Sequence, residues 1–181
     1  ALMLVIIFTI LITPISKCDE ADGGKSPIMT YVNNMNPGWN LGNTFEATGD
    51  ETSWGNPPTT EELIKAIAAQ GYKSIRIPIT WKHRMGDAPD YLIKPEFMLR
   101  IQEVVDWSLD AGLYVMINLH HDSGSWIMKM EEEHDEVLNR FNSVWKQISA
   151  HFRDYPDKLM FESVNEPRFS DDWSKDAPEY F

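Results

Sequence analysis

Short apolar runs alternate with longer amphipathic stretches along most of the chain. Four of the apolar runs are predicted to be β-strands: residues 38–43, 74–79, 114–119 and 159–164. Strands that are apolar at nearly every position are typical of a parallel sheet covered on both faces. The pattern therefore favours an α/β protein over an open antiparallel sheet.

The stretches between these runs have helical spacing. Thr59 or Thr60 can cap a first helix that ends near Gly71, Pro95 opens a second helix, and residues 137–152 form a third. Four strand–helix repeats without a Gly-rich phosphate loop favour a barrel over a nucleotide-binding sheet. A complete (β/α)8 TIM barrel takes about 250 residues. We therefore expect this chain of 181 residues to be a barrel truncated to roughly its first four β/α units.

The N-terminal segment differs from the rest. Leu2–Ile12 is apolar but too short to span a bilayer, and it fits the core of a signal peptide. We predict an N-terminally incomplete signal peptide at 1–17, a linker and lead-in at 18–34, and the half barrel at 35–181. The protein is then exported, to the outside or to the cell surface. Cys18 is either the lipid anchor of a bacterial lipoprotein or an incidental thiol after an ordinary cleavage site.

Composition narrows the classes of function. A net charge of −12 argues against nucleic-acid binding, which needs clustered Lys and Arg. The 43% hydrophobic content and seven Trp can supply a large core. The single Cys allows no disulfide within the chain.

Polar residues follow three of the predicted strands. Arg76 lies on the second, His120 and His121 end the third, and Asn165 and Glu166 end the fourth. Because active sites of parallel barrels lie at the C-terminal ends of the strands, we expect these side chains to converge. Glu166 can serve as a general acid, while Asn165 can bind a sugar hydroxyl and hold Glu166 in place. The alternatives are an exposed loop carboxylate and a cap for the next turn.

Arg76 lies between Ile75 and Ile77, so its side chain points to the opposite face of the strand. A guanidinium inside a barrel needs acceptors. Arg76 can form a structural ion pair with Glu162, or it can keep a catalytic carboxylate ionised. The two hypotheses are compatible.

The run His120-His121-Asp122 invites a metal-site hypothesis. Adjacent strand residues point to opposite sides of a sheet, however, and metal-binding pairs on strands use His-x-His spacing. We therefore disfavour a metal site, and we expect both His to bind substrate through hydrogen bonds.

Three tryptophans lie in predicted strand-end loops: Trp54, Trp126 and Trp173. An indole face suits the apolar C–H face of a sugar, so each is a candidate substrate platform. The alternative for each is an ordinary loop anchor.

Taken together, these motifs resemble glycoside hydrolase family 5, the cellulase family of (β/α)8 barrels, and most closely its subfamily 4. That subfamily includes endo-β-1,4-glucanases and xyloglucanases. The resemblance is carried, in family order, by Gly38–Thr44, Ser53–Pro57, Ile75–Trp81, Asn118–Asp122 and Phe161–Pro167.

The resemblance implies that Glu166 is the general acid/base, Asn165 its substrate-binding neighbour, Arg76 a support for the nucleophile and His120 part of the reacting subsite. We add Asn43 as a further substrate-binding candidate. The family nucleophile is a second Glu at the end of the seventh strand, which lies beyond this chain. We therefore expect the 181-residue segment by itself to be inactive.

The implied function is retaining endo-hydrolysis of β-1,4-glucan in plant cell-wall degradation, and it requires no metal or organic cofactor. The full-length protein is expected to be a monomer whose partner is the polysaccharide. Three alternatives remain open. The same barrel can act on mannan, xylan or xyloglucan; a gene that ends at Phe181 would give a non-catalytic glycan-binding surface protein; and a metal-dependent hydrolase would carry a bound ion.

Overall fold

The computed structural model describes residues 26–168. The predicted signal peptide, Cys18 and Trp173 lie outside the described residues, so those predictions stand untested.

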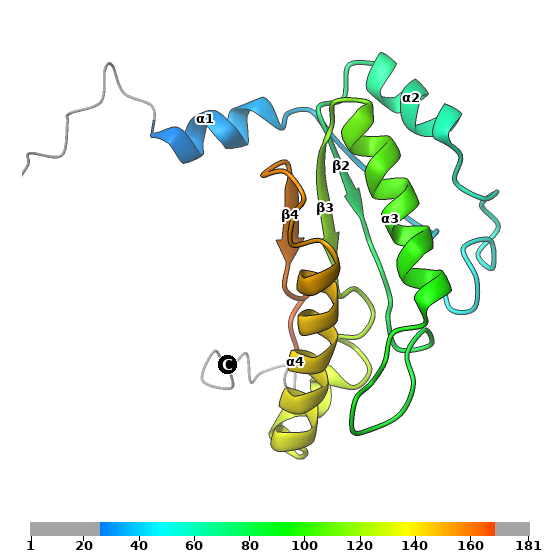
Figure 1. The fold of residues 1–181 in the computed structure, drawn as a ribbon, viewed down its shortest axis with the longest axis vertical. Helices are drawn as coiled ribbons and strands as arrows, with labels where there is room; N and C mark the ends of the chain where they lie inside the picture. The colour runs from blue at the N-terminus through cyan, green and yellow to red at the C-terminus, as the bar shows by residue number, and fades with distance from the viewer. Residues whose placement is uncertain (1–25, 169–181) are drawn as a thin grey trace, which may run out of the picture.

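The core of the fold is a four-stranded parallel sheet whose strands follow one another in chain order (Figure 1). The strands are β1 (Gly38–Asn40), β2 (Ser74–Ile77), β3 (Tyr114–Asn118) and β4 (Leu159–Glu162). Each of the four begins where the apolar pattern predicted and ends one to three residues earlier. This is the arrangement expected of the first half of a (β/α)8 barrel.

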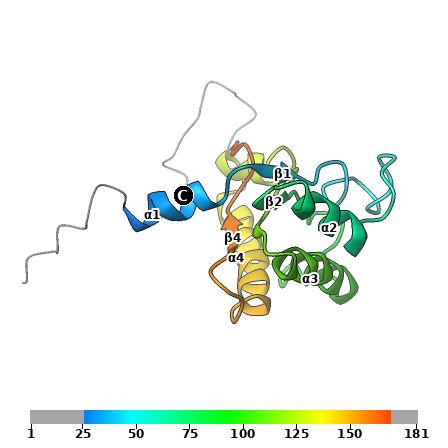
Figure 2. The same cartoon turned by 90° about the horizontal axis from the view of Figure 1, so that it is seen from above.

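The helices α2 (Glu61–Ala69), α3 (Pro95–Asp110) and α4 (His134–His151) lie together on one side of the sheet (Figure 2). The Thr60 hydroxyl caps α2 by accepting a hydrogen bond from the backbone N–H of Leu63 at 3.2 Å. Helix α4 begins three residues before its predicted start. Its first turn carries Asp135 and Glu136, which favour a helix N-terminus because their charge complements the helix dipole.

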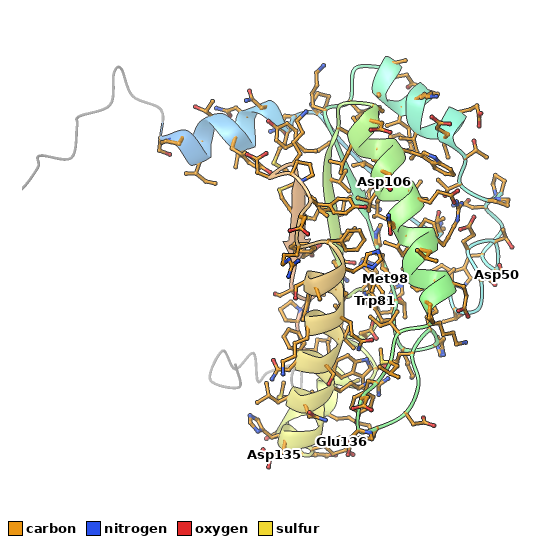
Figure 3. All side chains as sticks on the ribbon, viewed as in Figure 1. Asp50, Trp81, Met98, Asp106, Asp135 and Glu136 are labelled. Carbon is orange, nitrogen blue, oxygen red and sulfur yellow. The ribbon has the colours of Figure 1, made fainter. Side chains whose placement is uncertain are left out.

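The two faces of the sheet carry different residues. Ile75 and Ile77 of β2, and Val115 and Ile117 of β3, are fully buried beneath the helices. Figure 3 shows Trp81 and Met98 in the same layer, between the sheet and α3. Burying one such side chain stabilises the fold by about 1.5–3 kcal/mol. The core therefore lies between sheet and helices, while the opposite face carries the half-buried Met116 and Met160 together with Arg76 and Glu162.

Two elements were not predicted. Helix α1 (Pro27–Asn34) occupies part of the expected lead-in, with Ser26 as its N-cap and Pro27 at its first position. The 3-10 helix η2 (Ile127–Glu131) lies between β3 and α4. Within residues 26–168, no helix is both long and apolar enough to cross a membrane.

Helix α1 lies near the N-terminal ends of the strands. The Tyr31 hydroxyl donates to the carbonyl of Asp157 at 2.5 Å, and its ring packs edge-on against Tyr114 at the start of β3. The helix buries none of its own residues completely, and its apolar side chains Ile28, Met29 and Val32 are exposed.

Candidate functional site

Arg76 and Glu162 form a two-pronged ion pair on the face of the sheet opposite the helices. The Arg76 Nε lies 2.7 Å from one carboxylate oxygen of Glu162, and Nη2 lies 2.9 Å from the other. This geometry matches the planar fork of the guanidinium to both oxygens. The ion pair predicted from the alternation around Arg76 is confirmed.

The same guanidinium collects two amide oxygens. Arg76 Nη2 also donates to Oδ1 of Asn165 at 2.9 Å, and Nη1 donates to Oδ1 of Asn40 at 3.1 Å. Asn40 and Arg76 are register partners on β1 and β2, while Asn165 follows β4. Arg76 therefore ties the first, second and fourth strands together at their C-terminal ends.

Asn118 extends this cluster to the third strand. Its Nδ2 lies 3.1 Å from an oxygen of Glu162, its register partner on β4, and 3.1 Å from Nδ1 of His120. Its Oδ1 accepts the backbone N–H of Ile79 at 3.0 Å. One connected polar network, which we call the strand-end network, thus contains Asn40, Arg76, Asn118, His120, Glu162 and Asn165.

His120 is held in its neutral form. Its pKa is lowered to about 4, first because burial penalises the charged ring and then because His121 and Arg76 add like charge nearby. The ring of His121 lies 4.7 Å from that of His120, and the ring of Trp54 lies 5.5 Å from that of His121. Trp54 and His121 are both exposed, so a bound ligand can reach them.

The structure does not join the carboxylate of Glu166 to this network. Its side chain is 73% exposed, and its ion-pair partner among the described residues is Arg168, at 3.7 Å. The backbone is anchored nearby, because the N–H of Asn165 donates to the carbonyl of Leu119 at 2.8 Å. Glu166 itself has φ 42°, a left-handed conformation that non-glycine residues adopt mainly under constraint. The expected convergence of the strand-end side chains therefore does not extend to the Glu166 carboxylate, which lies exposed beside Arg168.

Asn43 lies in the loop after β1. It too is left-handed, with φ 60°, which Asn tolerates better than most residues. Its backbone N–H and that of Thr44 donate to the buried carboxylate of Glu46, at 2.5 and 2.9 Å. Glu46 therefore holds the shape of this loop, while Asn43 is exposed at the same edge of the sheet as the network.

Trp126 is a correction to the predicted substrate platforms. Its ring is only 6% exposed, its Nε1–H donates to Asp122 at 2.7 Å, and the guanidinium of Arg140 lies 4.7 Å from the ring centre. The indole is packed into the loop after β3, so Trp126 is an ordinary loop anchor, which was the alternative hypothesis for this residue. Asp122 lies only four residues before Trp126, but the sequence does not show that its carboxylate accepts the indole N–H, and Arg140 of α4 reaches the ring only in the folded chain.

The sequence motifs contained the strand-end network but did not assign all of its roles. Arg76, His120 and Asn165 were predicted site residues, and the structure brings them into one network. Asn40 and Asn118 belonged to quoted motifs without an assigned function. Within residues 26–168, no group of three or more His, Cys, Asp or Glu side chains is placed to hold a metal ion.

Comparisons with known proteins agree with this geometry. The family model described as cellulase, glycosyl hydrolase family 5, matches residues 40–180. Endoglucanase B of Paenibacillus lautus is 54% identical over 177 residues, covering 97% of this chain and 31% of the relative. A xyloglucan-specific endo-β-1,4-glucanase of Bacteroides ovatus is 42% identical over 142 residues, covering 73% of this chain and 28% of that protein.

Solved structures give the same result. A tri-modular endo-β-1,4-glucanase B from Bacillus halodurans matches with a TM-score of 0.81 and 57% identity, over 86% of this chain and 29% of that one. A trimodular endoglucanase of subfamily 4 matches with a TM-score of 0.83 and 55% identity, over 87% and 30%. The chain therefore spans about a third of the length of these relatives. With four parallel strands in barrel order, a polar network at their C-terminal ends and a family match over most of its length, the chain belongs to glycoside hydrolase family 5.

Proposed function

We propose that the full-length protein is a retaining endo-β-1,4-glucanase and that this segment supplies its acid/base half. The observation that carries the proposal is the strand-end network. In it, Arg76 binds Glu162 and also Asn165, which is the residue directly before Glu166. The names of the relatives support a β-glucan as the substrate class.

In the proposed mechanism, Glu166 protonates the departing glycosidic oxygen while a second carboxylate attacks the anomeric carbon. Glu166 then deprotonates water, which releases the sugar from the covalent intermediate. Retention requires the two carboxyl groups to lie about 5–5.5 Å apart. The exposed side chain of Glu166 would leave Arg168 and take up that position when substrate is bound. Asn165, held by Arg76, would bind a sugar hydroxyl beside it.

The substrate platform is proposed to consist of Trp54, in the loop after β1, and His121, in the loop after β3. Both side chains are exposed and their rings lie 5.5 Å apart, so together they offer a surface for a sugar ring. Trp173 and Asn43 remain candidates for further contacts.

Replacing Glu166 by Ala in the full-length protein tests the role of this residue. Acid catalysis contributes about 10²–10⁴-fold, and glucans should show that loss in full because their leaving groups need protonation. An aryl glycoside with an acidic phenol leaves without help, so its first step should be nearly normal and the glycosyl-enzyme should accumulate. Azide needs no base and should restore turnover, giving a β-glycosyl azide. Equal losses on both substrates without azide rescue would mean that Glu166 is not the acid/base.

Xyloglucan is the second candidate substrate, because relatives named as xyloglucan-specific share the fold and much of the sequence. Comparing kcat/KM on carboxymethyl-cellulose, mixed-linkage β-glucan, xyloglucan, mannan and xylan decides between these activities. If the full-length protein binds these glycans and cleaves none, the non-catalytic alternative holds.

We also propose that the protein is exported, on the strength of the apolar run Leu2–Ile12. For Cys18 the two alternatives are a lipid anchor and an incidental thiol. Labelling cells with a radioactive fatty acid, and comparing the natural protein with Cys18→Ser, distinguishes a lipoprotein from an ordinary secreted enzyme.

A further inference from the structure

The amide of Asn118 can take only one orientation. Asn118 is the last residue of β3 and is fully buried. Its Oδ1 accepts the Ile79 N–H, and its Nδ2 faces the Glu162 carboxylate. A reversed amide would place the NH2 group against the Ile79 N–H and the oxygen against the carboxylate. Both contacts would be unfavourable, because each would pair two donors or two acceptors.

This orientation decides the state of His120. The amide nitrogen of Asn118 has two hydrogens and two acceptors at 3.1 Å, an oxygen of Glu162 and Nδ1 of His120. One hydrogen goes to each, since a buried donor left without an acceptor is costly. Nδ1 of His120 must then be the acceptor and carry no proton. In a neutral imidazole the single proton lies on the other nitrogen, Nε2.

The surroundings of His120 keep the ring neutral. Burial disfavours the imidazolium, and the charged or titratable groups that face it are His121, Arg76, Glu46 and Glu162. The two carboxylates favour a positive ring, but burial, His121 and Arg76 outweigh them and hold the pKa at about 4. His120 therefore does not become a second donor at Nδ1 near neutral pH.

We propose that Asn118 is a positioning residue that holds His120 as a neutral imidazole with its proton on Nε2, so that Nε2 donates a hydrogen bond to an oxygen of the bound sugar. The sugar as partner rests on the proposed function, whereas the position of the proton rests only on the network. In this arrangement His120 is neither an acid nor a base in the reaction. It presents one fixed donor to the ligand.

The position of the proton can be measured directly. We would label histidine with ¹⁵N in the full-length protein and assign the His120 signals by their loss in His120→Gln. At pH 7 we expect a pyridine-like Nδ1 and a proton-bearing Nε2. A proton on Nδ1, or a ring that titrates near pH 6.5, would overturn the proposal. This readout does not depend on catalysis, so a protein without glucanase activity would refute the proposed function and still decide the tautomer.

Asn118→Asp tests whether Asn118 sets the tautomer. A carboxylate can still accept the Ile79 N–H, but it turns an acceptor toward both His120 and Glu162. A proton at Nδ1 of His120 would donate to this carboxylate and reduce its repulsion with Glu162, so we expect the proton to move to Nδ1. We expect kcat/KM to fall by about 10²-fold, the usual effect of losing one preorganised donor. The exposed Asn139→Asp makes the same charge change on α4 and should behave like the unmutated protein. An Nε2 proton that persists in Asn118→Asp would contradict the positioning role.

Two replacements of His120 separate the donor at Nε2 from the ring as a packing group. The Gln amide nitrogen reaches the place of Nε2, while the shorter Asn amide ends near Nδ1. We expect His120→Gln to keep about tenfold more kcat/KM than His120→Asn, the contribution of one hydrogen bond. Equal losses would mean that Nε2 donates nothing to the substrate.

Discussion

Two carboxylates near the ends of neighbouring strands are held by different kinds of donors. Asp122, in the loop after β3, is fully buried and accepts only neutral donors: the backbone N–H groups of Trp81 and Lys82 and the indole N–H of Trp126, at 2.7–3.0 Å. Glu162, at the end of β4, has a side chain 28% exposed and binds the guanidinium of Arg76 and the amide of Asn118.

The difference separates two sites. We call Asp122 with its three donors the structural corner, and Glu162 with Arg76 and Asn118 the functional corner. The donors to Asp122 are backbone and indole groups that cannot turn toward a ligand, so this carboxylate joins the loops after β2 and β3. The donors to Glu162 are the side chains of Arg76 and Asn118, which also bind Asn165 and His120 respectively. Glu162 therefore stabilises the orientation of groups that we propose to meet the substrate. The same acidic group anchors a loop in one place and orders a site in the other.

The largest expected effect comes from breaking the structural corner. Asp122→Ala leaves three donors without an acceptor, at about 1–3 kcal/mol each, so we expect the full-length protein to lose roughly 3 kcal/mol or more of unfolding free energy. Chemical denaturation measures this loss. Asp90→Ala, at an exposed loop position, is the control. Similar stability in the two variants would show that water or other groups replace the carboxylate.

Glu162→Gln tests the functional corner. The amide keeps the size of the side chain but removes the charge opposite Arg76 and turns a donor toward the network. We expect kcat/KM on β-glucan to fall by about 10²-fold, with a smaller loss of stability, about 1–2 kcal/mol. Glu103→Gln removes the charge of a half-exposed partner of Arg100 and should leave kcat/KM unchanged. A large loss of stability with normal kcat/KM would make Glu162 a structural residue like Asp122.

The pH dependence of stability sharpens the comparison further. The pKa of His120 is lowered from 6.5 in the unfolded chain to about 4, so between these values the unfolded state binds more protons. Its contribution to stability is complete above pH 6.5, falls as the pH falls toward 4, and is constant below that. The stability difference between the natural protein and His120→Gln, followed by denaturation at several pH values, should show this slope. A flat difference would mean that the ring is not held neutral.

The smallest effect is expected outside both corners. Lys65 pairs with Glu61 one turn away on α2, and both side chains are well exposed. Such pairs are weakened by water and salt. Lys65→Ala should therefore leave the melting temperature and kcat/KM unchanged within error. A clear change would show that ion pairs here cannot be ranked by burial.

Much of the architecture is local and could be predicted from the sequence. The apolar runs predicted where all four strands begin, because alternation and apolar content depend on neighbouring residues. Thr60, Gly71 and Pro95 marked helix boundaries for the same reason. The order of the motifs identified the family, and the alternation around Arg76 showed that its side chain leaves the helix-covered face.

The tertiary structure alone decided which groups meet. Arg76 and Glu162 are 86 positions apart, and their pairing depends on the register between β2, β3 and β4. The orientation of Asn118 depends on Ile79 after β2 and Glu162 on β4, and the ring of Trp126 packs against Arg140 of α4. Short-range patterns carry the information for strands, helices and caps. The state of a buried polar group is set by donors and acceptors that only the folded chain brings together.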